Sequence, residues 1–185
     1  MTAHLAAQPG LAADFAAGLT GRIPQIATTH TRLRAPHLGD APAWTALLCG
    51  PATEFLGGPY SESAAFDAFS AGVGMWLLRG HGLWSVEDSA TGTLLGFVLL
   101  GFESGDLEPE LGYLFLPQAE GKGLAYEAAC AARDHARALA LPSLVSYVAP
   151  GNDRSAQLAA RLGARPEPGP DGSTCWRHWK VEGRQ

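Results

Sequence analysis

The chain has 185 residues, of which 46% are hydrophobic, and this length suits one globular domain without room for a second full one. The formal net charge is -5 and the basic residues are scattered, so the basic surface of a nucleic-acid-binding protein is missing. No apolar run approaches the roughly 20 residues that span a bilayer. A signal peptide would require a basic residue near its start, but no Lys or Arg precedes Arg22. We therefore expect a cytoplasmic protein with neither nucleic-acid nor membrane partners.

Residues 1–28 are interpreted as an N-terminal extension ahead of one domain at 29–185. Hydrophobic periodicity and capping residues, among them Asp40 as a cap, predict helices at 11–19, 40–48, 61–71, 123–140 and 152–162. Alternating or short apolar runs predict strands at 30–36, 83–88, 93–102, 110–116, 143–149 and 174–181.

The order of these elements indicates the topology. Short, turn-rich connections join the strands at 83–88, 93–102 and 110–116, which predicts an antiparallel meander. The helix at 123–140 then leads to the strand at 143–149, and such a crossover places 110–116 and 143–149 side by side and parallel. The fold class is therefore α+β, with a mixed sheet and helices on its faces.

The stretch QAEGKGLAYEA, residues 118–128, places two glycines at the start of a helix. The unpaired main-chain N–H groups and the positive end of the helix dipole favour an anion there. Gly121 and Gly123 allow the main chain to approach a phosphate closely. We therefore expect this turn to bind a pyrophosphate.

Two common nucleotide-binding motifs do not fit this turn. A phosphate-binding loop of the Walker type requires Ser or Thr where the chain has Gly123. A dinucleotide-binding fingerprint requires a third glycine where the chain has Tyr126, and it belongs on the first strand of a fold. Nucleotide hydrolysis and dinucleotide binding are therefore disfavoured.

A different family pattern matches. Gln118, Gly121 and Gly123 fit the sequence [QR]-x-x-G-x-[GA] of GNAT acetyltransferases. The wider stretch ELGYLFLPQAEGKGLAYEA resembles the RimJ/RimL-like branch of that family. NDRSAQLAARLGA, residues 152–164, resembles the later N-x-x-S and L-G-F segments of the same branch, although Ala164 replaces the phenylalanine. The resemblance covers residues 29–181.

The resemblance implies a fold and an activity. The fold would be a mixed, mostly antiparallel twisted sheet of six to seven strands, with helices on both faces and a splayed parallel strand pair. The activity would be an acetyl-CoA-dependent N-acetyltransferase that moves the acetyl group to a primary amine, on a protein N-terminus or a small molecule, by direct attack through a tetrahedral intermediate. The partners would be acetyl-CoA and the amine acceptor, and the chain would act as a monomer or homodimer.

The resemblance also assigns site residues. Those implied to bind the cofactor are Leu114, Leu116, Gln118, Glu120, Gly121, Lys122, Gly123, Leu124, Ala125, Asn152 and Ser155. Asn152 would bond the pantetheine amide, or would simply cap its helix. The acceptor site would be built from the loops at 51–60 and 165–176. No ligand set for a metal is evident, so His135 and His178 are interpreted as structural, and the three cysteines as reduced.

Two residues are candidates for catalysis. Glu110 matches the position of a general-base glutamate in the family and would act through a water, or it is a solvated carboxylate at the end of a strand; Glu108 is a weaker candidate. Ser155 would contact the thioester sulfur, because the tyrosine that serves many relatives as thiol acid falls at Ala159. Glu127 is expected to complement the helix dipole. The alternative function is a non-catalytic acyl-CoA-binding sensor or interaction module with the same fold.

Overall fold

The structure is a computed structural model that describes residues 3–6 and 8–181. Residues 1–2 and 7 of the predicted extension, and residues 182–185 of the predicted domain, lie outside the described part. The described strands are β1 (Ile26–Ala27), β2 (Thr31–Arg34), β3 (Leu83–Asp88), β4 (Leu94–Gly101), β5 (Glu110–Phe115), β6 (Ser143–Val148), β7 (Arg165–Pro168) and β8 (Thr174–Lys180). The described α-helices are α1 (Leu11–Thr20), α2 (Ala41–Leu48), α3 (Glu62–Arg79), α4 (Leu124–Ala138) and α5 (Asp153–Arg161).

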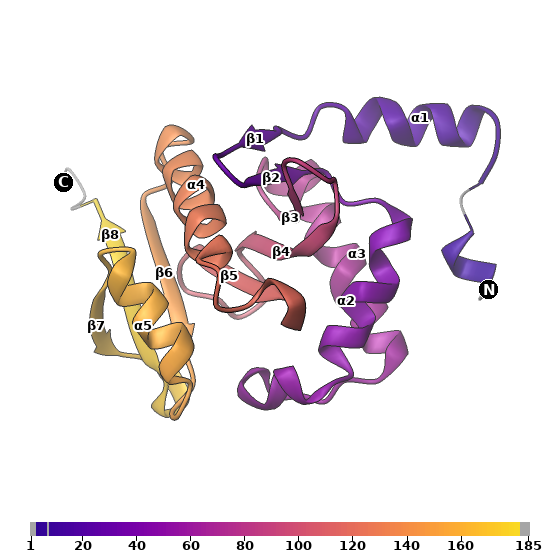
Figure 1. Cartoon of the computed structure of the whole chain (residues 1–185). Helices are drawn as coiled ribbons and strands as arrows, with labels where there is room; N and C mark the ends of the chain where they lie inside the picture. Colours follow the sequence, from indigo (N-terminus) through magenta and orange to yellow (C-terminus); the bar gives the residue numbers. More distant parts are fainter. Residues whose placement is uncertain (1–2, 7, 182–185) are drawn as a thin grey trace.

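These strands form one sheet in the order β1-β2-β3-β4-β5-β6-β8-β7 (Figure 1). The strands β3, β4 and β5 are an antiparallel meander, as predicted. β5 and β6 are the one parallel pair among the described strands, and α4 connects them. The predicted fold class, mixed α+β with a mostly antiparallel sheet, is therefore confirmed.

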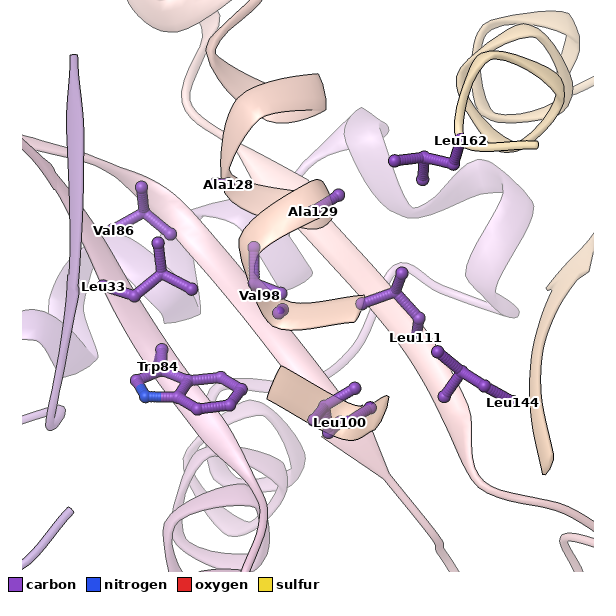
Figure 2. Packing of buried hydrophobic residues seen from close by; sticks show 12 residues of the cluster. Leu33, Trp84, Val86, Val98, Leu100, Leu111, Ala128, Ala129, Leu144 and Leu162 are labelled. Atoms are coloured by element: carbon purple, nitrogen blue, oxygen red, sulfur yellow. The ribbon is translucent and has the colours of Figure 1, made fainter. Parts of the chain in front are cut away.

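Helices cover both faces of the sheet. One buried cluster joins the alanine face of α4 to alternating strand residues, and Figure 2 shows Ala128 and Ala129 above Val98 and Leu111. The opposite face carries a second cluster, in which Phe97 of β4 packs with side chains of α2 and α3. The small buried residues of α4 let this helix lie close to the strands, because alanine adds little thickness between helix and sheet.

The sheet has two more strands than the six that the sequence patterns predict. β1 has only two residues, too few for a periodicity to be visible. β7 contains Pro166 and Pro168, which argue against a strand in the interior of a sheet. Both prolines are tolerated because β7 is the last strand in the order, where one side needs no ladder hydrogen bonds.

The helix α3 extends beyond its predicted end at residue 71 and finishes at Arg79. Gly72, the residue after the predicted end, lies inside the helix against β3, where an added Cβ would come within 3.1 Å of the Leu83 Cβ. The glycine therefore serves close packing. Asp40 also differs from the prediction, because its buried carboxylate bonds to Arg34, the His37 main chain and Ser85 instead of capping α2.

The predicted extension includes α1, which contributes no buried residue. Its Leu11 side chain is 87% exposed. Among the described residues, no helix has both the length and the apolar character needed to cross a membrane.

Candidate active site

The turn between β5 and α4 has the conformation that its glycines suggest. Gly121 and Gly123 have φ angles of 72° and 77°, in the left-handed region that L side chains rarely adopt. Gly123 is the N-cap of α4, and no side chain among the described residues caps this helix start. The first N–H groups of α4 therefore lack a side-chain partner and are suited to an anion.

Two polar contacts stabilise the same turn. The Lys122 ammonium donates to the main-chain oxygen of Gln118 at 2.8 Å, which turns this side chain back onto the loop. The carboxylate of Glu120 forms an ion pair of 3.0 Å with Arg154, in the first turn of α5. The start of α5 thus lies beside the predicted phosphate turn. Arg154 was not among the predicted site residues, and its sequence signal is its place between Asn152 and Ser155.

β5 and β6 separate soon after they meet. They share one paired register, Glu110 with Val145, in which the Val145 N–H donates to the Pro109 oxygen at 3.0 Å. In a regular parallel ladder the next bond would join the Tyr147 N–H to the Leu111 oxygen. We call the separation beyond this point the splay; it is the splayed parallel pair that the family resemblance implies.

Side chains occupy the two main-chain groups at the start of the splay. The Tyr147 N–H donates to Glu110 Oε1 at 3.0 Å. The Leu111 oxygen accepts from Ser146 Oγ at 2.7 Å. Since both groups already have partners, the ladder bond between them is not needed to satisfy buried polar atoms. The local sequence therefore ends the pairing without leaving unpaired groups.

The carboxyl group of Glu110 lies in an environment that favours its protonated form. Burial is the main cause, and the negative charges of Asp106 and Glu103 add to it, while the bond from Tyr147 opposes it. The net effect is to raise the pKa of Glu110 to about 7. The alternative candidate, Glu108, forms two hydrogen bonds of 2.8 and 2.9 Å with Arg177, which lower its pKa and hold it as an ion-paired carboxylate.

The register of β5 shows which main-chain groups face the splay. Leu116 donates its N–H to the Leu95 oxygen at 2.9 Å, toward the β4 side. Antiparallel pairing alternates along a strand, so Leu114 has the same orientation. The main-chain groups of Tyr113 and Phe115 therefore point to the side of the splay. The side chains of Leu114 and Leu116 pack against the cluster around α2 and α3.

The start of α5 brings Asn152 and Ser155 together. Asn152 Oδ1 accepts from the Ser155 N–H at 3.2 Å, which confirms that Asn152 caps α5. The Tyr113 hydroxyl donates to the Ser155 main-chain oxygen at 3.1 Å and thereby links β5 to α5. Burial is the main cause that raises the pKa of Tyr113 to about 12.

Three residues, Ser146 and His178 near the splay and Glu127 beside β2, have contacts that the sequence patterns do not predict. Ser146 was not singled out at all, and His178, expected to be structural, lies 3.2 Å from the Ser146 hydroxyl. Glu127 is held by hydrogen bonds from Thr28, His30 and Thr31, and therefore does more than complement the helix dipole. These partners lie about 100 residues away in the chain or on another strand, and no local pattern predicts them.

Of the two segments predicted to form the acceptor site, the one at 51–60 lies near the end of β6. Phe55, in the loop at 51–60, lies 3.7 Å from the position that a Cβ on Gly151 would take. The other predicted loop, 165–176, instead contains β7 and the start of β8, and Glu167 of β7 bonds to Arg177 at 2.8 Å, next to the Glu108 pair.

A parallel strand pair that splays, followed by a glycine-flanked helix start suited to a pyrophosphate, is the arrangement expected of an acyltransferase that uses a CoA thioester. Residues 30–165 match the family model described as acetyltransferase (GNAT) domain. A crystal structure of an acetyltransferase from Agrobacterium tumefaciens str. C58 is 34% identical, over 85% of this chain and 95% of that chain, with a TM-score of 0.82. The chain belongs to the GNAT acetyltransferase family.

More distant structures share the fold. RimL, a ribosomal L7/L12 alpha-N-protein acetyltransferase solved with coenzyme A, is 16% identical with a TM-score of 0.69, over 85% of this chain and 98% of that chain. Spermidine N-acetyltransferase from Vibrio cholerae, solved with CoA and spermine, is 21% identical with a TM-score of 0.65, over 81% and 94%. Acetyl-CoA is accordingly the cosubstrate, and the protein is an acyltransferase.

Proposed function

We propose that this acetyltransferase moves the acetyl group of acetyl-CoA to a primary amine by direct attack, with Glu110 as general base. A base that works near neutral pH requires a pKa near neutrality. Glu110 meets this condition, since its pKa is about 7, and its carboxylate lies where β5 and β6 separate. This raised pKa at the start of the splay is the observation that carries the proposal.

In the proposed reaction, Glu110 takes a proton from the incoming ammonium, directly or through a water. The amine nitrogen then attacks the thioester carbon, the new C–N bond forms a tetrahedral intermediate, and the C–S bond breaks with its electron pair on sulfur. The nitrogen loses its second proton as the amide forms, and the leaving CoA thiolate takes up one proton to become the thiol. We assign Ser155 to contact the sulfur. Main-chain N–H groups on the splay side of β5 are suited to stabilise the oxyanion.

We also propose how the cofactor is bound. Its pyrophosphate would accept from the N–H groups of residues 121–125, where Gly121 and Gly123 have left-handed φ angles, since the Glu120 N–H already donates to the Pro117 oxygen at 3.2 Å. Its pantetheine arm would lie in the splay, between Tyr113 or Phe115 on one side and Asn152 on the other. The main-chain orientation of β5 supports Tyr113 and Phe115 rather than Leu114 and Leu116 as hydrogen-bonding partners.

A primary amine is the proposed acceptor class. The sequence pattern of the RimJ/RimL-like branch supports it, as do the fold neighbours that act on an alpha-N-protein substrate and on spermidine. Protein N-termini and small amines both remain acceptors to be tested.

The experiment is a thiol-release assay with acetyl-CoA against polyamines, simple primary amines and peptides with a free N-terminus. Acetylated amine, identified by mass spectrometry in amounts equal to the released CoA, is the expected result. Glu110→Gln keeps the shape of the side chain and should abolish turnover while CoA still binds. If wild-type protein binds CoA and no amine releases thiol beyond the rate in water, the non-catalytic sensor replaces the enzyme.

A further inference from the structure

The splay begins at a hydrogen bond between a side chain and the main chain. Ser146 is a buried residue of β6, and its hydroxyl reaches across to the main-chain oxygen of Leu111 in β5, at 2.7 Å. This oxygen is the group that Tyr147 would otherwise bind to continue the parallel ladder. The Tyr147 N–H binds Glu110 instead, at 3.0 Å. Ser146 is thus the hydrogen-bond partner of the first main-chain oxygen of β5 beyond the paired register with β6.

His178 of β8 orients that serine. Its Nε2 lies 3.2 Å from Ser146 Oγ. The serine hydrogen points to the Leu111 oxygen, which can only accept, so the hydrogen between Ser146 and His178 must belong to Nε2. His178 Nδ1 is then the unprotonated nitrogen, and it has no hydrogen-bond partner among the described residues. Burial, with the positive charges of Arg133 and Arg137, lowers the pKa of His178 to about 4 and keeps it neutral.

We propose that Ser146, oriented by His178, is a positioning residue that holds β5 and β6 apart where the cofactor arm enters. Removal of the hydroxyl leaves a buried carbonyl oxygen on Leu111 without a partner, which is costly. The closest remedy is the ladder bond from Tyr147, which draws β6 toward β5. That bond also takes from Glu110 the N–H that it binds. This inference rests on the proposed place of the pantetheine arm in the splay.

The test is CoA binding by isothermal titration calorimetry, with the melting temperature of each variant measured in parallel. The comparison is between wild type, Ser146→Ala and Ser146→Thr. We expect Ser146→Ala to bind CoA about tenfold more weakly, the effect of one lost buried hydrogen bond. Ser146→Thr keeps the hydroxyl and should recover most of the affinity. A purely structural serine would change the melting temperature of the alanine variant and leave its CoA affinity unchanged.

Ser143 offers a matched control. It is a buried serine of the same strand, opposite Lys180 of β8 and before the splay. Ser143→Ala makes the same chemical change and should leave CoA affinity at the wild-type value. Equal losses in Ser143→Ala and Ser146→Ala would overturn the proposal, as would wild-type affinity in Ser146→Ala.

His178 variants keep the inference testable if Ser146→Ala does not fold. His178→Leu removes the N–H that orients the hydroxyl and should weaken CoA binding by about threefold, while His178→Gln supplies a replacement N–H and should restore it. Equal CoA affinity in both variants and wild type contradicts the role of His178. Failure of the wild-type protein itself to bind CoA would instead refute the proposed cofactor site, so the two failures are distinguishable.

Discussion

Glu127 accepts hydrogen bonds from both the main-chain N–H and the imidazole of His30, at 2.6 and 2.9 Å. Glu127 belongs to the first turn of α4, and His30 to the turn between β1 and β2. Thr28 and Thr31 donate to the same carboxylate. The helix that carries the proposed phosphate site is therefore attached to the N-terminal edge of the sheet, on the side away from the splay.

The first prediction concerns the stability that Glu127 confers. Burial opposes its ionisation, but the hydrogen bonds from Thr28, His30 and Thr31 outweigh burial and lower the pKa of Glu127 to about 2. A carboxyl group whose pKa is lowered in the folded state stabilises the fold at pH values above its ordinary pKa of 4.5. This stabilisation is lost as the pH falls toward 2. Glu127→Gln should lower the free energy of unfolding by about 1–2 kcal/mol at pH 6.

Urea unfolding at pH 6 and pH 3 checks this. The difference between wild type and Glu127→Gln should shrink at the lower pH, where the wild-type carboxylate takes up a proton in the unfolded chain. An unchanged difference at pH 3 would contradict the assigned role. Glu62, an exposed acidic residue in the first turn of α3, is a control whose replacement by Gln should change little.

The second prediction concerns the pH dependence of catalysis. Glu110 must be deprotonated to act as base, so kcat/KM should rise with pH through an ionisation near 7. The acceptor amine contributes a second ionisation at its own pKa. Comparing acceptors of different amine pKa separates the two, because only the Glu110 ionisation stays fixed. A rate that follows the ionisation of the acceptor alone would exclude Glu110 as the base.

The third prediction concerns how Glu110 affects the stability of the fold as the pH changes. The effect has the opposite sign to that expected for Glu127. The folded-state pKa of Glu110 is raised, so the unfolded chain loses its proton first, and stability should fall as the pH rises from about 4.5 to about 7. Glu110→Gln removes this dependence and can still accept from Tyr147. At pH 8 the variant should be more stable than wild type by an amount on the order of 1–3 kcal/mol, measured by urea unfolding. Lower stability at that pH would contradict the raised pKa.

The fourth prediction compares two glycines. Gly123→Ala places a Cβ at a φ of 77°, so the variant should lose about 1 kcal/mol of stability and bind CoA more weakly. Gly74 lies inside α3 with nothing within 4 Å of an added Cβ, and its φ is not in the left-handed region. Gly74→Ala should therefore gain up to about 1 kcal/mol and keep its CoA affinity. Thermal unfolding and calorimetry together check both signs, and weaker CoA binding in Gly74→Ala would remove the contrast.

Local sequence determined most elements of this fold. The alternation in β4, the apolar periodicity of α4 and the turn residues between the meander strands each act over a few neighbouring residues, so the sequence reveals them. The crossover from β5 through α4 to β6 then follows from chain geometry. The conformation of the turn before α4 was also predictable, because the left-handed φ angles of Gly121 and Gly123 depend on the glycines themselves.

Only the tertiary structure decided the features that depend on distant partners. α3 continues past Gly72 because Leu83 packs against it, and β7 forms despite its prolines because it lies at the sheet edge. The pKa of Glu110 depends on burial, and the end of the ladder depends on Ser146 reaching Leu111. Burial and long-range hydrogen bonds exist only once the chain has folded, and no local pattern of residue types contains them.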